Sequence, residues 1–358
     1  MTDVLDGDVA EAPLCGGCAL QTIPLDEQLA AKRESVAAAL RNAGVEAEVA
    51  PCIDAHGTGR RRATFHARRG EDGVLRVGFS EARSHRIVDL AEHECPILLP
   101  AVQAAAEPVR LLAKHLLGLK KPIDAVVTST ETGLDIDLRG AGKIPEKLRL
   151  GLVEIAGQTG LARLAVHGDT VVEMRPPVVR FGHAEVVPPP GGFLQATQAG
   201  EEVLVRLVLE HLEGAKQVGD LFAGSGTFTL RIAVFAEVKA YENNRDALAS
   251  LDRAWRATAG LKRITIEGRD LFRRPVTTGE LNAMDAVVFD PPRAGAEAQA
   301  WEIMRSRVNR VVAVSCNPGT FARDLKILTE GGFKPGIVTP VDQFRHSAHV
   351  EAVAVLTR

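Results

Sequence analysis

Strand-like and helix-like segments alternate along the second half of the chain, and this pattern restricts the possible folds most strongly. Apolar segments at 217–222, 238–242, 264–267, 286–290 and 310–315 are interleaved with helix-like segments ending near 235 and at 246–258, 298–306 and 320–330, before a closing pair at 336–341 and 351–356. Such alternation predicts an α/β fold with a mainly parallel sheet covered by helices on both faces.

The first half of the chain has the pattern of a separate α+β module. Strand-like segments occur at 75–79, 125–129 and 134–138, and helical periodicity occurs at about 99–117 and 146–159. Three prolines and two glycines at 188–192 form a strong breaker between the two patterns. We therefore predict a domain boundary near residue 188.

A glycine-rich turn at 220–229 follows the first strand of the second half. Gly224 and Gly226 would let a ligand approach the backbone where a helix begins. The dinucleotide fingerprint requires a third glycine where this chain has Thr229, which argues against an NAD site. Glu242, after the next strand, is placed to accept hydrogen bonds from ribose hydroxyls, and Asp270 to face an adenine, although either carboxylate alone could be a solvent-facing strand end.

Three reactive side chains lie at the ends of later strands. Asp290 begins an Asp-Pro-Pro-Arg motif, Cys316 lies in Ser-Cys-Asn-Pro, and Glu351 ends His-Ser-Ala-His-Val-Glu. Ligands of open α/β sheets bind outside the carboxyl ends of the strands, and the Asn-Pro turn would expose the thiol there. A lone cysteine is often only a packed hydrophobe, but beside carboxylates and imidazoles it predicts a nucleophilic, proton-transferring site.

Charge and cysteine content indicate the partners. The net charge is −3, yet eight arginines lie between positions 60 and 86, so Arg60, Arg61 and Arg62 either bind phosphate or form a solvated turn. Five cysteines without a leader-like N-terminus favour metal binding or catalysis over disulfides. We expect a cytoplasmic monomer without a membrane span, because the N-terminus is acidic and long apolar runs are absent.

Together these motifs resemble the uridine-5 RNA methyltransferase family, in particular its iron–sulfur-containing branch that modifies bacterial 23S ribosomal RNA. The resemblance rests on Cys-Gly-Gly-Cys, Phe-x-Gln, Asp-Leu-Phe-x-Gly-x-Gly, Asp-Pro-Pro-Arg, Ser-Cys-Asn-Pro and His-Ser-x-His-x-Glu. It implies a class I, Rossmann-like S-adenosylmethionine methyltransferase domain at 189–358, an α+β RNA-binding domain at 26–188, and iron–sulfur segments at 1–25 and 90–98. Transfer RNA is the alternative substrate.

The resemblance also implies roles for individual residues. Cys316 would add to carbon 6 of uracil, Glu351 would remove the C5 proton, and Asp290 would hydrogen-bond the ring or its transition state. The implied cofactor-binding residues are Gln195, Phe222, Gly224, Gly226, Thr227, Glu242, Asp270 and Asp290. Thr197 stands where the family has asparagine. The arginines at 60–62 would hold the RNA backbone around an unpaired uridine.

The cysteine motif matches a [4Fe–4S] site only in part. Cys15, Cys18 and Cys95 match three ligands, whereas Val9 occupies the position of the family's first ligand. Cys52, another type of side chain or water would have to supply the fourth ligand. A zinc site and a cluster that has been lost are the alternatives.

Two other functions share some of these features. A small-molecule or protein methyltransferase can have the same cofactor sheet, but direct transfer to oxygen or nitrogen needs no cysteine nucleophile. A non-catalytic RNA-binding protein would not need Cys316, Glu351 and the glycine turn together. The sequence therefore favours an RNA-modifying enzyme.

Overall fold

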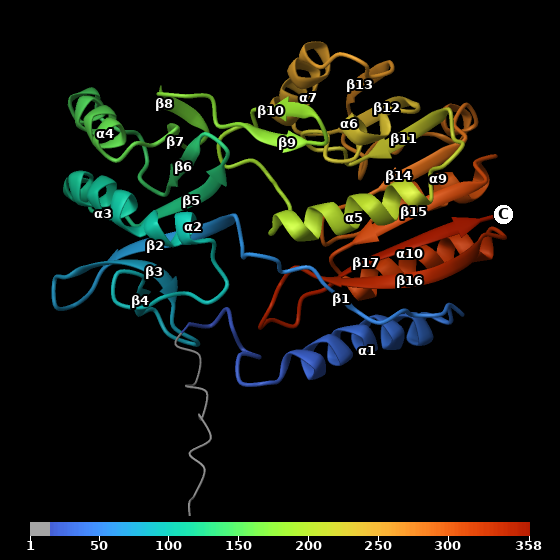
Figure 1. The fold of residues 1–358 in the computed structure, drawn as a ribbon, viewed down its shortest axis with the longest axis horizontal. Coiled ribbons are helices and arrows are strands. Elements are labelled where there is room, and N and C mark those ends of the chain that lie inside the picture. Colours follow the sequence, from blue (N-terminus) through green and yellow to red (C-terminus); the bar gives the residue numbers. More distant parts are fainter. Residues whose placement is uncertain (1–14) are drawn as a thin grey trace, which may run out of the picture.

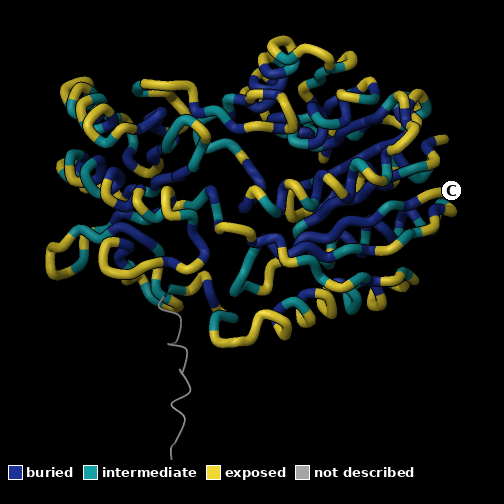
Figure 2. The backbone as a smooth tube through the Cα atoms, in the orientation of Figure 1, coloured by how far each residue is buried: buried dark blue, intermediate teal, exposed yellow. Residues whose placement is uncertain are grey.

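A computed structural model describes residues 15–358, in which two large sheets lie beside each other (Figure 1). The strand order in the larger sheet is β1-β16-β17-β15-β14-β11-β12-β13, and in the smaller sheet it is β4-β3-β2-β5-β6-β7-β8. The strands form the buried interior of the molecule (Figure 2). Among the described residues, no helix is both long and apolar enough to cross a bilayer.

The larger sheet confirms the predicted α/β pattern. Its strands are β1 (Ile53–Asp54), β11 (Gln217–Leu221), β12 (Glu237–Glu242), β13 (Ile264–Gly268), β14 (Ala286–Phe289), β15 (Arg310–Ser315), β16 (Lys334–Asp342) and β17 (Glu351–Thr357). Neighbouring strands pair in parallel except that β17 runs antiparallel to both β15 and β16. The strand order reverses at β11 and β14, and such a switch point is where open α/β sheets bind ligands.

Helices cover both faces of this sheet. They are α1 (Leu25–Ala43), α5 (Gln198–Glu210), α6 (Thr229–Ile232), α7 (Arg245–Ala257), α8 (Thr278–Leu281), α9 (Glu297–Arg305) and α10 (Pro318–Glu330). Val288 and Val312 belong to one hydrophobic core, together with residues of α5 and α7. Their neighbours Val287 and Val311 belong to a second core with residues of α1, α9 and α10. This alternation follows from the two-residue period of a strand.

The smaller sheet forms the α+β module. Its elements are β2 (Arg62–Arg69), β3 (Leu75–Ser80), β4 (Ile87–Asp89), α2 (Pro100–Ala104), α3 (Ala106–His115), the short 3₁₀ helix η1 (Leu117–Leu119), β5 (Ile123–Thr130), β6 (Gly133–Arg139), α4 (Glu146–Gln158), β7 (Arg163–Val166) and β8 (Asp169–Glu173). The single helix predicted at 99–117 is interrupted at Ala105. Pro108 explains the break, because it cannot donate to the carbonyl four residues earlier.

Two segments within the predicted central domain, 26–188, pack against the larger sheet. Helix α1, which the sequence pattern did not reveal, packs on α10 and β16, and its Val36 and Leu40 enter the second core of the larger sheet. The ribbon formed by β9 (Val179–Phe181) and β10 (Ala184–Val186) contributes Phe181 and Val186 to the first core. Both segments bury their apolar side chains against the larger sheet rather than the smaller one.

Candidate active site

The three predicted reactive residues meet at one edge of the larger sheet. Asp290 follows β14 and Cys316 follows β15, so both leave the carboxyl ends of parallel strands. Glu351 begins β17, whose opposite direction brings its first residue to the same edge. The pairing of Ser315 with Ala352 places Glu351 alongside Cys316. Residues between 26 and 61 positions apart in the sequence are thereby brought together.

The loop after Cys316 has the conformation that the Asn-Pro sequence predicted. Asn317 caps α10, accepting hydrogen bonds at Oδ1 from the backbone N–H groups of Gly319 and Thr320 at 3.0 and 3.4 Å. Its Nδ2 donates to the Arg293 carbonyl at 3.2 Å. The cap joins the Ser-Cys-Asn-Pro and Asp-Pro-Pro-Arg motifs and leaves Cys316 half-buried.

The glycine-rich turn joins β11 to α6 in a conformation suited to a ligand. Phe222, Gly224 and Gly226 have φ values of 66°, 55° and 99°, in the left-handed region that glycine adopts easily. No heavy atom lies within 4 Å of the position of a Cβ on Gly224, so its backbone is open to an approaching group. The Gly224 N–H donates to Glu242 Oε2 at 3.0 Å, which fixes the turn against the next strand end.

Aromatic and acidic side chains surround this turn. The rings of Phe222 and Phe272 lie 5.5 Å apart, and Phe272 is half exposed. Asp270 Oδ1 accepts hydrogen bonds from the N–H groups of Phe272 and Arg273, so that carboxylate also caps its own loop. Asp220, whose role the sequence did not reveal, is buried and accepts a hydrogen bond from Thr229 at 2.5 Å. Burial raises the pKa of Asp220 to about 7.

Two glutamines link the carboxyl groups of Asp290 and Glu351. Gln195 Nε2 donates to Asp290 Oδ2 at 3.1 Å. Gln343 Nε2 donates to Gln195 Oε1 at 2.6 Å and to Glu351 Oε1 at 3.1 Å. Both glutamines are buried, and Glu351 Oε2 is buried without a partner among the described residues. Gln343 was not predicted, although its place between β16 and the His-Ser-x-His-x-Glu motif was a signal.

Thr197, which stands where the family has asparagine, has a structural role. Its hydroxyl donates to the Ala55 carbonyl at 2.7 Å and accepts from the Gly200 N–H at 2.9 Å, which caps α5. An N-terminal threonine cap stabilises a helix by about 1 kcal/mol. The side chain is fully buried and is committed to these contacts.

Burial changes the protonation of the reactive groups. It raises the pKa of Asp290 to about 7, although the Gln195 hydrogen bond opposes the shift. Burial and then the nearby Asp290 charge raise the pKa of Glu351 to about 8. Burial, followed by the charges of Glu351 and Asp290, raises the pKa of Cys316 to about 11. Near neutral pH the free protein therefore holds a thiol, which must lose its proton before it can act as a nucleophile.

Helix α1 supports the loop that connects Gln343 to Glu351. Lys32 Nζ lies 2.6 Å from Asp342 Oδ1, with both side chains almost fully buried, and also donates to the Phe344 carbonyl. Gln28 accepts a hydrogen bond from the His346 N–H at 3.0 Å. Helix α1 therefore helps to position the loop beside the site, although Lys32 and Phe344 are 312 positions apart in the sequence.

The three consecutive arginines do not act together. Arg61 is buried and pairs with Glu201 at 2.5 Å, so its charge is already balanced within the protein. Arg60 and Arg62 are half-buried and form no ion pair with any described residue. Arg60 lies 5.8 Å from the centroid of the Phe344 ring, and Arg62 donates to a backbone carbonyl of the 188–192 segment. Burial lowers the pKa of both guanidinium groups, as expected for cations without a counter-charge.

The cysteine segments lie together, but Cys52 is not with them. Cys15, Cys18 and Cys95 line one cavity of about 300 Å³. Cys52 packs against the second core of the larger sheet, which argues against it as the fourth ligand. Val9 lies outside the described residues. Across residues 15–358, no three Cys, His, Asp or Glu side chains are arranged to hold a metal ion. Three described cysteines thus share this cavity, one fewer than a four-cysteine cluster needs.

Comparison with known proteins gives consistent matches. A family model described as tRNA (uracil-5-)-methyltransferase matches residues 152–358. An uncharacterised RNA methyltransferase of Brucella melitensis is 49% identical over 344 residues, covering 96% of this chain and 82% of the relative. The 23S rRNA (uracil(1939)-C(5))-methyltransferase of Halomonas elongata is 31% identical over 366 residues, covering 96% and 74%.

A solved structure resembles nearly the whole fold. It is the tRNA (uracil-54, C5)-methyltransferase of Pyrococcus abyssi in complex with S-adenosyl-L-homocysteine. The match has a TM-score of 0.72 at 25% identity and covers 96% of this chain and 86% of that chain. The likeness thus includes both large sheets.

Proposed function

The chain belongs to the tRNA (uracil-5-)-methyltransferase family, and from this premise we propose that it methylates carbon 5 of a specific uridine through a covalent adduct with Cys316. One observation carries the proposal. Cys316, Asp290 and Glu351 lie at a single edge of the sheet, next to an open glycine turn. A methyltransferase that acts directly on oxygen or nitrogen would have no use for that thiol.

The proposed chemistry begins at Cys316, because C5 of uracil is a poor nucleophile. The Cys316 thiolate adds to C6, and the electron pair of the C5–C6 bond moves into an enolate. S-adenosylmethionine supplies the methyl group that C5 accepts. Glu351 then takes the C5 proton, and the C6–sulfur bond breaks to restore the ring and the thiolate. Glu351 is suited to this step, because its Oε2 has no partner among the described residues and its pKa of about 8 makes it a competent base.

Asp290 and Gln195 are proposed to bind and orient the uracil ring. A carboxylate raises the pKa of a neighbouring thiol, so Asp290 does not activate Cys316 through its charge. The Gln195 amide is held in one orientation by Asp290 on one side and Gln343 on the other. Groups that are oriented before the substrate binds lower the cost of aligning the reacting atoms.

The cofactor would be held along the glycine turn. Gly224 leaves the backbone accessible, whereas Gly226 allows the turn to pack closely against Leu251 and Leu230. Thr227 and Phe222 flank the turn. Glu242 accepts three backbone N–H groups, yet a carboxylate has about four lone-pair sites and can still accept from a ribose hydroxyl. Asp270 is proposed to bind the adenine end of the cofactor, because it follows the neighbouring strand β13.

Arg60 and Arg62 are proposed to bind phosphates of the RNA backbone. Side chains alternate along an extended strand, so these two share a side while Arg61 points to the other. Both cations are half-buried without a described acidic partner, and an RNA phosphate would supply the missing counter-charge. The target uridine must leave its stack to reach Cys316, which favours an unpaired position.

We favour 23S ribosomal RNA as the substrate. Support comes from the relative that acts on 23S rRNA, which aligns with 96% of this chain. Transfer RNA is the second candidate, because the solved structure with a TM-score of 0.72 is a tRNA methyltransferase. A [4Fe–4S] cluster at Cys15, Cys18 and Cys95 stays a prediction, and no step proposed above passes through it. Iron content and visible absorption after anaerobic purification would test it.

The decisive experiment uses labelled S-adenosylmethionine and total RNA from a strain that lacks the enzyme. We expect one labelled uridine in 23S rRNA, identified as 5-methyluridine after digestion. Cys316→Ala should transfer no label while binding S-adenosylhomocysteine as tightly as the wild type. Label in transfer RNA would favour the second candidate, and normal turnover by Cys316→Ala would exclude the covalent mechanism.

A further inference from the structure

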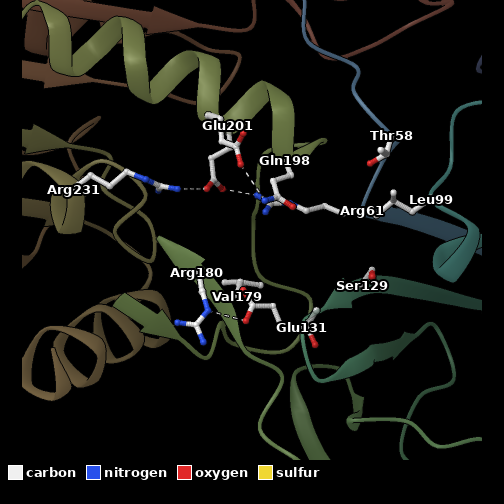
Figure 3. A pocket seen from close by; sticks show the side chains of 13 residues that line it. Thr58, Arg61, Leu99, Ser129, Glu131, Val179, Arg180, Gln198, Glu201 and Arg231 are labelled. Carbon is white, nitrogen blue, oxygen red and sulfur yellow. Dashed lines mark hydrogen bonds and ion pairs between the residues drawn. The ribbon is translucent and has the colours of Figure 1, made fainter. Parts of the chain in front are cut away.

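A buried carboxylate on α5 joins arginines from two different parts of the fold. Figure 3 shows Arg61 and Arg231 approaching Glu201 from opposite sides. Glu201 Oε2 lies 2.5 Å from Arg61 Nη2, and its Oε1 lies 2.6 Å from Arg231 Nη2. Only 2% of the Glu201 side chain is exposed. Arg61 immediately precedes β2 of the smaller sheet, and Arg231 belongs to α6, directly after the glycine turn.

Each arginine uses another nitrogen to hold the backbone of a functional segment. Arg61 Nε donates to the Gln195 carbonyl at 3.2 Å. Arg231 Nη1 donates to the Thr227 carbonyl at 2.8 Å. Gln195 lies in the proposed uracil site and Thr227 in the proposed cofactor turn. One carboxylate therefore orients both guanidinium groups, and each of these groups contacts one of the two segments.

We propose that Glu201 is a positioning residue that holds the cofactor turn and Gln195 in register with the smaller sheet. A guanidinium group can donate to a carboxylate and a carbonyl at the same time, whereas a lysine ammonium has a single nitrogen and cannot reproduce that fork. Loss of the Glu201 charge would leave two largely buried cations without their shared partner. The predicted effect on catalysis through Gln195 rests on the proposed RNA methylation. The predicted effect on cofactor binding through the glycine turn does not.

Two lysine variants separate the two connections. Arg231→Lys should raise the Kd for S-adenosylhomocysteine about tenfold and leave kcat at saturating cofactor unchanged. Arg61→Lys should lower kcat about tenfold, because Gln195 loses its support. It should raise that Kd less than Arg231→Lys does, because the glycine turn keeps its contact with Arg231. Glu201→Gln should change both. Glu202→Gln is the matched control, since Glu202 is the exposed next residue and accepts only from Gln198.

Thermal unfolding midpoints show which variants are folded. If Glu201→Gln is folded and matches the wild type in both Kd and kcat, the proposal is wrong. It is also wrong if the two lysine variants change Kd and kcat equally, because a general loss of stability would do that. If Glu201→Gln does not fold, the two lysine variants still test the proposal, because they keep the positive charges. If the wild type methylates no RNA, the proposed function fails, while the Kd measurements still test the role of Glu201.

Discussion

Gln343 donates a hydrogen bond from Nε2 to Glu351 Oε1 at 3.1 Å, although a loop of seven residues separates them in sequence. The same amide group donates to Gln195, so one side chain orients the proposed base and part of the proposed uracil site. A hydrogen bond donated to a carboxylate stabilises its charged form, and this contact accordingly lowers the pKa of Glu351, against the larger effect of burial.

Replacing Gln343 by leucine should therefore raise the pKa of Glu351 above its present value of about 8. Because the base must be ionised to accept a proton, the acidic limb of the kcat/KM profile should move to higher pH. Gln198→Leu, an exposed change on α5, should leave the profile where it is. An unchanged acidic limb in Gln343→Leu would show that Gln343 does not tune the base.

Replacing Glu351 by glutamine should trap a covalent complex between the protein and RNA. The methylated adduct would lose its route to proton removal, and the complex should survive denaturing electrophoresis. In the free protein, losing the Glu351 charge should lower the pKa of Cys316 from about 11, so alkylation by iodoacetamide at pH 8 should be faster. Rapid turnover without an adduct would assign the base to another residue.

Removing the charge of Arg60 or Arg62 should weaken RNA binding through phosphate contacts. Each single change to methionine should reduce the slope of log affinity against log salt by about 1. Arg180→Met is the control, because that exposed arginine already pairs with Glu131 and Glu185. Equal salt dependence in all these proteins would place the RNA elsewhere.

The ion pair between Lys32 and Asp342 should contribute strongly to stability. Lys32→Met leaves a buried carboxylate without its partner, which typically costs about 3–5 kcal/mol of unfolding free energy. The double variant Lys32→Met with Asp342→Leu should recover much of that loss in denaturant titrations. Arg41→Met, which breaks an exposed pair on the same helix, should change stability little. A double variant as unstable as the single one would argue against the buried charge as the cause.

Stability should fall as pH rises from about 7 to 8, above the ordinary pKa of 6.5 of the histidines whose pKa values are lowered by burial, His56, His211, His346 and His349. Asp220, Asp290 and Glu351 have ordinary pKa values of 3.8, 3.8 and 4.5, raised in the folded protein to about 7, 7 and 8. Between these limits the folded state binds more protons than the unfolded state, so the unfolding free energy decreases with pH. Asp290→Asn should make the profile shallower. Denaturant titrations at several pH values measure this, and a rise in stability over the range would contradict it.

The sequence by itself determined the larger sheet and most of the site. Strand and helix periodicities, the glycine turn and the Asn-Pro turn are local signals, and the rule that ligands bind at the carboxyl ends of parallel strands placed Asp290 and Cys316 together. The sequence pattern did not predict helix α1, because its buried face carries Gln28 and Lys32 and its N-terminus has no side-chain cap. These polar residues are buried only because the 342–346 loop supplies their partners.

Tertiary structure alone decided which polar side chains meet. Nothing in the sequence distinguishes Arg61 from Arg60 and Arg62, yet strand alternation and the position of α5 direct Arg61 to Glu201. Gln343 acquires its role only in the folded protein. There β17 brings Glu351 beside Cys316, and the segment before α5 brings Gln195 within hydrogen-bond distance of Gln343. Local patterns specify elements and their ends, whereas partners separated by more than a hundred residues are chosen by the packing of those elements.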